Sequence, residues 1–174
     1  NKLDDDLNFL ESNLRLWFDA KNIDGLNNTT ISDGDQIVQW LDLSGLDNHT
    51  YQNDATEIPV YRASDNEVYF EDDHLDISNS PIPTGASESY TLIAVSRLTA
   101  DNSGRGNDGV ISSDKNAPFS REIRYSLNYF RGEHWGGSTN SAPVEATISQ
   151  DNIIISSYEG SIPHQKLFFN GALV

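Results

Sequence analysis

The feature that most constrains the fold is a repeated alternation of short apolar runs with polar segments rich in Asn, Asp, Gly and Ser. Each run has the length of a strand and is too short for a typical helix. The residues between the runs tolerate turn dihedrals or hydrogen-bond their own backbone. We count about ten such runs and no long helical pattern. The sequence therefore predicts an all-β fold of two packed antiparallel sheets.

Two runs near the N-terminus each carry a tryptophan and lead into an aspartate. They cover Leu14–Phe18 and Ile37–Leu41, and a long polar segment separates them. We expect both runs to be strands. Their tryptophans, Trp17 and Trp40, are large side chains that we expect to anchor the core.

The most apolar run is Tyr90–Leu98. Its near-continuous hydrophobicity predicts a strand at the centre of a sheet, buried on both faces. Asn170-Gly171 favours a type I′ turn, which predicts a hairpin over Lys166–Val174. The remaining strands are expected at Pro59–Tyr61, at Glu67–Leu75 (running into an acidic turn), and at Gly109–Ser113, Ile123–Phe130 and Ile148–Ser157.

Three phrases of the sequence carry a family resemblance: LWFDA, QWLDLSG and VYFEDDHLDI. They resemble the opening of the concanavalin A-like, laminin-G-type jelly rolls of bacterial secreted and surface proteins. The later pair IIISSYEG and KLFFNGALV resembles the late hairpin of laminin-G-like domains. The resemblance covers most of the chain and implies a two-sheet antiparallel jelly-roll sandwich. It also implies further strands after Val174, so the domain is either truncated here or completed by residues outside this chain.

The length of 174 residues suits one domain with a real core. We interpret residues 1–13 as a lead-in from a preceding module and residues 14–174 as the laminin-G-like domain. The chain opens without Met and has no signal peptide, which favours a mature or excised segment of a longer protein. It has no cysteine, which excludes a disulfide scaffold and is compatible with export. We expect an extracellular or cell-surface location with neighbouring domains.

The net charge of −16 narrows the class of partners. An acidic surface repels phosphate backbones, so we expect no nucleic acid partner. No apolar run approaches the roughly 20 residues that span a bilayer, so we expect no transmembrane helix. A glycan, or a surface protein or peptide, remains as the expected partner.

No catalytic constellation stands out. Glycosidases on this fold carry two carboxylates two residues apart on one strand, but the pairs with that spacing here lie in turn-like sequence. They are Asp4/Asp6, Asp33/Asp35 and Glu71/Asp73. There is no nucleophile elbow and no phosphate loop. The four histidines lack zinc-ligand spacing. We expect no enzyme activity, while a polysaccharide-degrading enzyme of the same fold stays open as an alternative.

The segment most suggestive of a binding site is Arg121–Trp135. It concentrates three of the seven arginines of an acidic protein among aromatic residues. Aromatic rings stack on the apolar faces of sugars, while Arg donates to hydroxyls or carboxylates. The candidate ligand-binding residues are Arg121, Arg124, Tyr129, Arg131, His134 and Trp135. An edge strand whose arginines pair with carboxylates is the structural alternative.

Calcium is the candidate cofactor, because hard cations take carboxylate and carbonyl oxygens in Gly-containing loops. The candidate metal ligands are Asp101 and Asp108, and the turn at Asp72 and Asp73 is a second possibility. Laminin-G-like relatives frequently hold one Ca²⁺ at the sheet rim, which is what the resemblance implies here.

These observations lead to one functional hypothesis and two rivals. The hypothesis is a non-catalytic carbohydrate- or protein-binding (adhesion) module of a larger extracellular protein, of the lectin type. The rivals are a structural spacer domain of a large adhesin and the polysaccharide-degrading enzyme. Fold resemblance alone does not separate them, because this architecture hosts all three.

Overall fold

The structure is a computed structural model of the whole chain. It describes residues 13–79, 81–83, 88–99, 107–113, 121–126, 129–134, 144–145, 148–160 and 164–173. Every element named in this part of the chain is a strand, and all pairings are antiparallel. The prediction of an all-β fold is therefore confirmed. The chain divides into two compact units, unit 1 (Asn1–Pro81) and unit 2 (Ile82–Val174).

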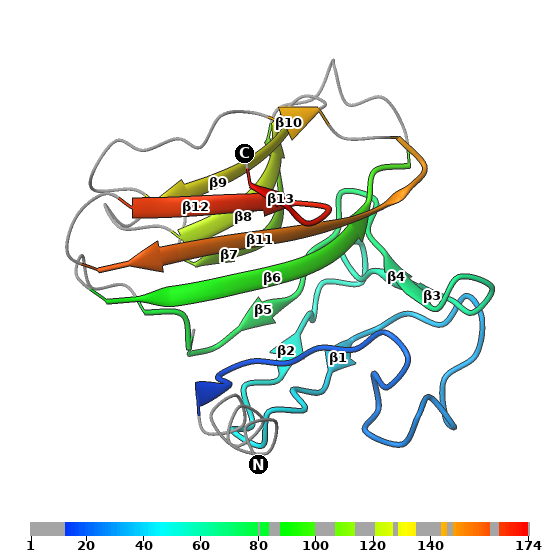
Figure 1. Ribbon diagram of the computed structural model, residues 1–174. Coiled ribbons are helices and arrows are strands. Elements are labelled where there is room, and N and C mark those ends of the chain that lie inside the picture. The colour runs from blue at the N-terminus through cyan, green and yellow to red at the C-terminus, as the bar shows by residue number, and fades with distance from the viewer. Residues whose placement is uncertain are drawn as a thin grey trace, which may run out of the picture. The chain divides into compact units, whose positions relative to one another are not determined.

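Unit 1 is made of short strands joined by long turns (Figure 1). A three-stranded sheet has the order β1-β2-β5, and a separate hairpin pairs β3 with β4. Ile23, Ile37 and Tyr61 form the buried core of unit 1. The strands are β1 (Gln39–Trp40), β2 (Thr50–Tyr51), β3 (Val60–Arg62), β4 (Glu67–Tyr69) and β5 (Asp76–Ile77).

The two tryptophan-bearing runs differ from the prediction. Leu14–Phe18 forms no strand, and only Gln39–Trp40 of the second run does. Trp40 packs against the core of unit 1, as expected. Trp17 does not anchor a core, because 49% of its surface is exposed. Its backbone is held instead: the Trp17 amide donates to Asp42, and its carbonyl accepts from the amide of Leu43.

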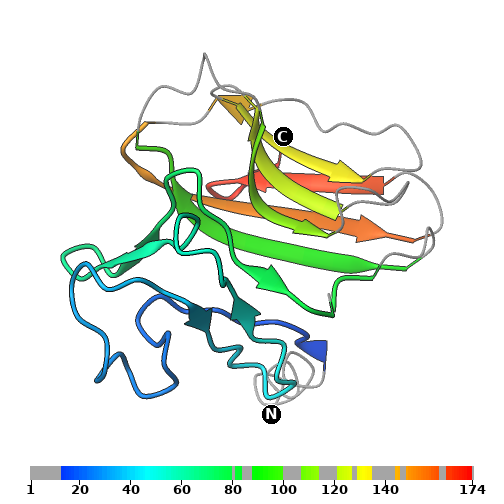
Figure 2. The ribbon, with the colours of Figure 1, turned by 180° about the vertical axis from the view of Figure 1, so that it is seen from behind.

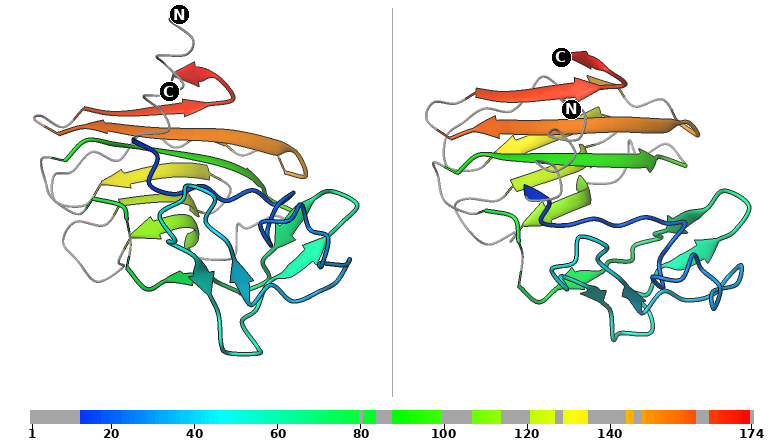
Figure 3. Two further views of the ribbon diagram at one scale, coloured as in Figure 1. Left: turned by 90° about the horizontal axis from the view of Figure 1, so that it is seen from below. Right: turned by 60° about the horizontal axis from the view of Figure 1, so that its bottom comes forward.

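Unit 2 contains two four-stranded sheets that form two layers (Figure 3). One sheet has the order β13-β12-β11-β6 and faces the viewer in Figure 1, and the other has the order β10-β9-β8-β7 and faces the viewer in Figure 2. The strands of the first are β6 (Tyr90–Arg97), β11 (Asp151–Glu159), β12 (His164–Phe169) and β13 (Ala172–Leu173). Those of the second are β7 (Asn107–Ser113), β8 (Arg121–Ser126), β9 (Tyr129–His134) and β10 (Val144–Glu145).

The core of unit 2 lies between its two sheets. Inward side chains alternate with outward ones, as the pleat of a strand requires. The cluster takes Ala94, Ile154 and Leu167 from the first sheet and Ile123, Tyr125 and Phe130 from the second. Unit 2 is therefore sandwich-like.

The strand β6 forms where Tyr90–Leu98 predicts it, but its burial is different. Its exposure alternates, with Ala94 buried and Ile93 and Val95 exposed at 62% and 68%. Among the described strands β6 pairs with β11 alone, so it lies at the end of its sheet. The prediction of a central strand buried on both faces is wrong. An apolar run also fits a strand whose outer face is apolar but uncovered.

The run Ile123–Phe130 is not one strand. β8 ends at Ser126 and β9 begins at Tyr129, and the two pair as a hairpin. Tyr125 and Phe130 are five residues apart, so a single strand would point them to opposite faces. The hairpin sets them opposite each other, with ring centroids 4.2 Å apart, and both enter the core.

The hairpin expected at the C-terminal end is confirmed. Phe169 pairs with Ala172 across the two-residue turn of Asn170 and Gly171. Both turn residues have positive φ, 47° and 83°, which is the type I′ requirement.

Candidate functional site

The β8–β9 hairpin of unit 2 brings together two of the predicted ligand-binding arginines. Arg124 and Arg131 are cross-strand partners and share the outer face of their sheet. Arg124 Nε lies 3.2 Å from a carboxylate oxygen of Glu122, and both of these side chains are only about one-sixth exposed, at 16% and 15%. Arg124 is therefore already engaged by an acid on its own strand, which is the arrangement expected of the structural alternative.

Arg121 lies on the other face of β8, between the two sheets. It is fully buried, and its guanidinium carbon is 5.5 Å from the ring centre of Tyr90 and 5.9 Å from that of Tyr158. The two tyrosine rings stack with centroids 5.7 Å apart. Burial raises the pKa of Tyr90 to about 12, although the Arg121 charge acts in the opposite direction. Arg121 is thus a residue of the core of unit 2 and does not share a face with Arg124 and Arg131.

The remaining predicted residues are only partly described. Tyr129 is 38% exposed and pairs with Glu145. It lies two residues before Arg131 on β9. His134 ends β9 and pairs with Arg121, and Asp108 lies in β7, but neither side chain is described. Trp135 and Asp101 lie outside the described residues.

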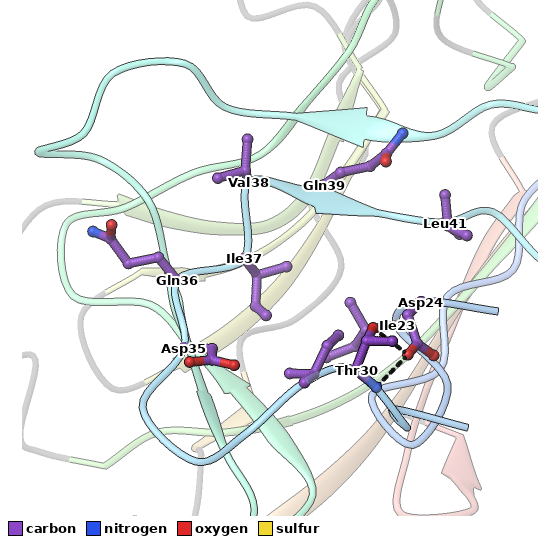
Figure 4. A pocket seen from close by; sticks show the side chains of 10 residues that line it. Ile23, Asp24, Thr30, Asp35, Gln36, Ile37, Val38, Gln39 and Leu41 are labelled. Atoms are coloured by element: carbon purple, nitrogen blue, oxygen red, sulfur yellow. Dashed lines mark hydrogen bonds between the residues drawn. The ribbon is translucent and has the colours of Figure 1, made fainter. Parts of the chain in front are cut away.

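A pocket of about 420 Å³ lies within unit 1, between the loop at 23–31 and the segment at 35–41 (Figure 4). Ile37 points toward the loop, whereas Val38 points away from it. The lining combines aliphatic side chains with carboxylates, amides and a hydroxyl. It consists of Ile23, Asp24, Thr30, Ile31, Asp35, Gln36, Ile37, Val38, Gln39 and Leu41.

Asp24 builds the loop side of this pocket. Its carboxylate accepts hydrogen bonds from the amides of Leu26 and Asn28, at 2.8 Å each. It also accepts from the amide and the hydroxyl of Thr30, at 3.1 and 2.8 Å. Gly25 follows with φ 72°, a conformation that only glycine adopts at little cost. One carboxylate therefore fixes six consecutive residues of loop.

The same hydrogen bonds stabilise the ionised form of Asp24. Its partial desolvation raises the pKa, but the bonds from Leu26, Thr30 and Asn28 outweigh it and lower the pKa from 3.8 to about 2. Hydrogen bonds to the ionised form favour that form. Asp24 is consequently a fixed negative charge at neutral pH and not a proton donor.

The opposite side of the pocket is held by the β3–β4 region. The amide of Ile37 donates to the carbonyl of Pro59, and Gln36 forms an isolated bridge with Val60. Asp35 accepts from the amide of Ser32 at 2.7 Å, which leaves acceptor positions on its carboxylate. Gln39 is exposed, and its amide can both donate and accept.

The polar groups that line this pocket are carboxylates, amides and a hydroxyl. Its lining holds no histidine, lysine or arginine and so offers no general acid beside its carboxylates. Elsewhere in the described part of unit 1, His74 lies 3.5 Å from both Glu57 and Asp76. No group of three or more His, Asp or Glu side chains in the described ranges could hold a metal ion.

The calcium prediction stays a prediction. Asp101 lies outside the described residues, and the side chain of Asp108 is not described. At the second possibility, the turn at Asp72 and Asp73, the Asp73 carboxylate accepts from the amide of Glu71 at 2.8 Å.

This pocket was not predicted from the sequence. The polar span between Leu14–Phe18 and Ile37–Leu41 was expected to be a long loop, and such a composition predicts turns without indicating that they enclose a space. The one signal was the dense spacing of Asp and Asn around Gly25, which is typical of loops that hydrogen-bond their own backbone.

Comparisons with known proteins add no relative: no family model, no curated protein and no solved structure matches the chain. Within the described ranges there is also no helix of the length and apolarity that crossing a bilayer needs.

Proposed function

We propose that this chain is a non-catalytic recognition module that binds a hydroxyl-rich ligand of the glycan class in the pocket of unit 1. The observation that carries the proposal is the composition of that pocket, in which Asp35 and Gln39 stand beside aliphatic side chains. Carboxylates accept hydrogen bonds from sugar hydroxyls, and amides bond them in either direction. Aliphatic surface contacts the C–H faces of the ring. Binding sites for small molecules commonly combine an apolar lining with a few placed polar groups.

The charge of the pocket narrows the ligand. Asp24 is ionised at neutral pH, and Asp35 adds a second acid, so an anionic glycan is repelled and a neutral or amino sugar is favoured. This differs from the acidic ligand that the arginines of the β8–β9 hairpin would select.

The absence of catalysis is part of the proposal. Glycoside hydrolysis needs one carboxylic acid that keeps its proton near neutral pH and a second carboxylate across the bond. Asp24 fails the first requirement, since its pKa is held at about 2. A rival enzyme would therefore need a group other than Asp24 as its acid.

The proposal also covers the complete fold of the module and its place in a larger protein. Unit 2 is sandwich-like, and we propose that the complete fold is the jelly roll that the sequence resemblance implies. We further propose an extracellular or surface-anchored protein with neighbouring domains, in which this module serves adhesion. The spacer alternative differs in one respect, since it requires no ligand.

The test is a glycan array followed by calorimetry with the best ligand. Gln39→Ala and Asp35→Asn are expected to weaken binding about tenfold each, because each removes one or two hydrogen bonds to hydroxyls. Gln150→Ala, at an exposed position in unit 2, is the matched control and is expected to bind as the native chain does.

Three outcomes would contradict the proposal. A clean array supports the spacer. Binding that survives Gln39→Ala but is lost in Arg124→Ala or Trp135→Ala assigns the ligand to the segment Arg121–Trp135 instead. Release of reducing or unsaturated ends from a polysaccharide identifies an enzyme.

A further inference from the structure

The polar side chains that line the pocket of unit 1 offer more hydrogen-bond acceptors than donors. Thr30 donates its hydroxyl proton to Asp24 at 2.8 Å (Figure 4), so its oxygen can only accept a further hydrogen bond. Gln36 uses one N–H of its amide on a backbone carbonyl at 3.4 Å. Asp35 accepts from one backbone amide at 2.7 Å and has further acceptor positions. Gln39 offers donors and acceptors alike, so a donor-rich ligand fits this lining best.

Asp24 contributes charge to the pocket and no open acceptor. Its two oxygens already take four hydrogen bonds, which is about the number that a carboxylate can accept. All four donors are neutral groups, so they stabilise the negative charge without cancelling it. A ligand therefore meets Asp24 as a fixed negative charge and Asp35 as both a charge and an acceptor.

Neither of these two carboxylates is paired with a cation of the protein. In the part of the chain that the structure describes, no lysine, arginine or histidine nitrogen lies within 4.0 Å of Asp24 or Asp35. Elsewhere in unit 1 such pairs do form, as between Arg62 and Glu67 at 3.5 Å. The described residues thus supply no countercharge to the pocket, and a cationic ligand would.

We propose that the ligand of this pocket is an amino sugar, and that its ammonium group binds Asp35. The inference rests on the function proposed for unit 1 and names the class of glycan. An ammonium group has three N–H donors and no acceptor, which matches the surplus of acceptors in the lining. It also carries the missing positive charge, which acts on Asp35 through a charge-assisted hydrogen bond and on Asp24 through space. Acetylation of the amine removes that charge, leaves one N–H donor and adds a carbonyl acceptor.

Calorimetry with two matched β-1,4-linked tetrasaccharides tests the inference. One consists of glucosamine and the other of N-acetylglucosamine, so the two differ only in the acetylation of their amines. At about pH 6 an amine is protonated and an exposed carboxyl is ionised. The glucosamine form is expected to bind the native chain at least about tenfold more tightly. Sodium chloride raised from about 0.05 to about 0.5 M is expected to reduce this difference, because it screens exposed charges.

Asp35→Asn tests the position of the ammonium group. It removes one charge at nearly constant shape, and it is expected to weaken binding of the glucosamine form about tenfold and of the acetylated form less than about threefold. Asp47→Asn is the matched control, because it removes the same charge from unit 1 at a side chain that is 90% exposed and outside the pocket lining. It is expected to change neither affinity. Circular dichroism of both variants confirms that they are folded.

The outcomes separate this inference from the function on which it rests. Equal binding of the two tetrasaccharides by the native chain overturns the inference and leaves the proposed function standing. A preference for the glucosamine form that Asp35→Asn does not reduce, or that Asp47→Asn reduces equally, overturns it as well, since the overall charge of unit 1 would then be the cause. If neither form binds and the glycan array is clean, the proposed function fails and this inference fails with it.

Discussion

Asp42 is the residue that ties the two tryptophan-bearing segments of unit 1 together. Asp42 is buried, with only 6% of its surface exposed. The carboxylate accepts from the amide of Trp17 at 2.9 Å, from the amide and hydroxyl of Ser44 at 3.0 and 2.7 Å, and from the amide of Asn48 at 3.1 Å. The sequence phrase that ends in Asp-Leu-Ser-Gly is thus a hydrogen-bonding centre and not merely a turn.

Replacement of Asp42 is expected to be strongly destabilising. Asp42→Ala leaves four partly buried donors without this acceptor, and we expect a loss of about 2–4 kcal/mol in the free energy of unfolding. Urea unfolding followed by tryptophan fluorescence measures it. Glu71→Ala, at an exposed position of the same unit, is the control and is expected to change stability by less than about 0.5 kcal/mol. Equal effects of the two substitutions would contradict this role.

The same residue predicts how stability depends on pH. Burial raises the pKa of Asp42, but the hydrogen bonds from Ser44, Trp17 and Asn48 outweigh it, and the pKa lies below 3.8. Asp24 is shifted in the same direction, to about 2. A lowered folded-state pKa means that the unfolded chain binds more protons, so this stabilisation is complete above pH 3.8 and is lost as the pH falls through the folded values.

We therefore expect the urea midpoint to fall between about pH 5 and pH 2, and to fall less steeply in Asp42→Asn. Urea titrations at a series of pH values measure both slopes. A native midpoint that stays level, or that rises on acidification, would falsify the assignment of these two carboxylates as stabilising groups.

The enrichment of Arg121–Trp135 in arginine is visible in the sequence, but the position of each arginine in the fold is not. The concentration of arginine in Arg121–Trp135 is real, but Arg121 is buried in the core of unit 2, whereas Arg124 lies on the outer face beside Glu122. A buried arginine in an apolar setting has no sequence signature, since it depends on the two tyrosines that pack around it from other strands. The residue pattern of Arg121–Trp135 is local, whereas the burial of Arg121 depends on packing between strands that are distant in the sequence.

Among the elements, the C-terminal hairpin shows how local chemistry fixes a turn. Gly171 has φ 83°, and a Cβ added there would meet nothing within 4 Å. A side chain at this position is therefore disfavoured only because the backbone has a left-handed conformation. Gly171→Ala is expected to cost about 1–2 kcal/mol. Gly171→Asn is expected to cost less, because asparagine tolerates this region.

Thermal unfolding of the two Gly171 variants measures this difference. Steric crowding would make asparagine, the larger residue, the worse of the two. An asparagine variant less stable than the alanine variant would therefore contradict the dihedral argument.

The positions of several strands could be predicted because the signals were local. Which neighbours cover each strand could not be predicted. Val60–Arg62, Tyr90–Arg97 and the hairpin around Asn170 lie close to their predicted positions. The break inside Ile123–Phe130 was missed, because the pairing of Tyr125 with Phe130 is a contact between strands. The exposed outer face of β6 was missed for the same reason, since an apolar run does not say which neighbour covers it.

For the whole molecule, the distribution of charge distinguishes the two units. Residues 1–81 hold 18 acidic and 4 basic side chains, a net charge of −14, while residues 82–174 hold 9 and 7, a net charge of −2. Like charges on a compact unit oppose its folding, and salt screens them over about 10 Å at 0.1 M. Self-repulsion should therefore weaken unit 1 far more than unit 2.

We expect sodium chloride, raised from about 0.01 to about 0.5 M, to stabilise unit 1 selectively, because the Debye length falls from about 30 Å to a few Å. Hydrogen exchange with mass spectrometry measures this, since amide protection should rise in peptides from 13–79 and stay nearly level in peptides from 148–160. Sucrose, which stabilises compact states without screening charge, is the control and should protect both regions. If salt protected the strands of unit 2 as strongly as those of unit 1, repulsion would not be what limits unit 1, and its stability would depend on the carboxylate-centred turns around Asp24 and Asp42 alone.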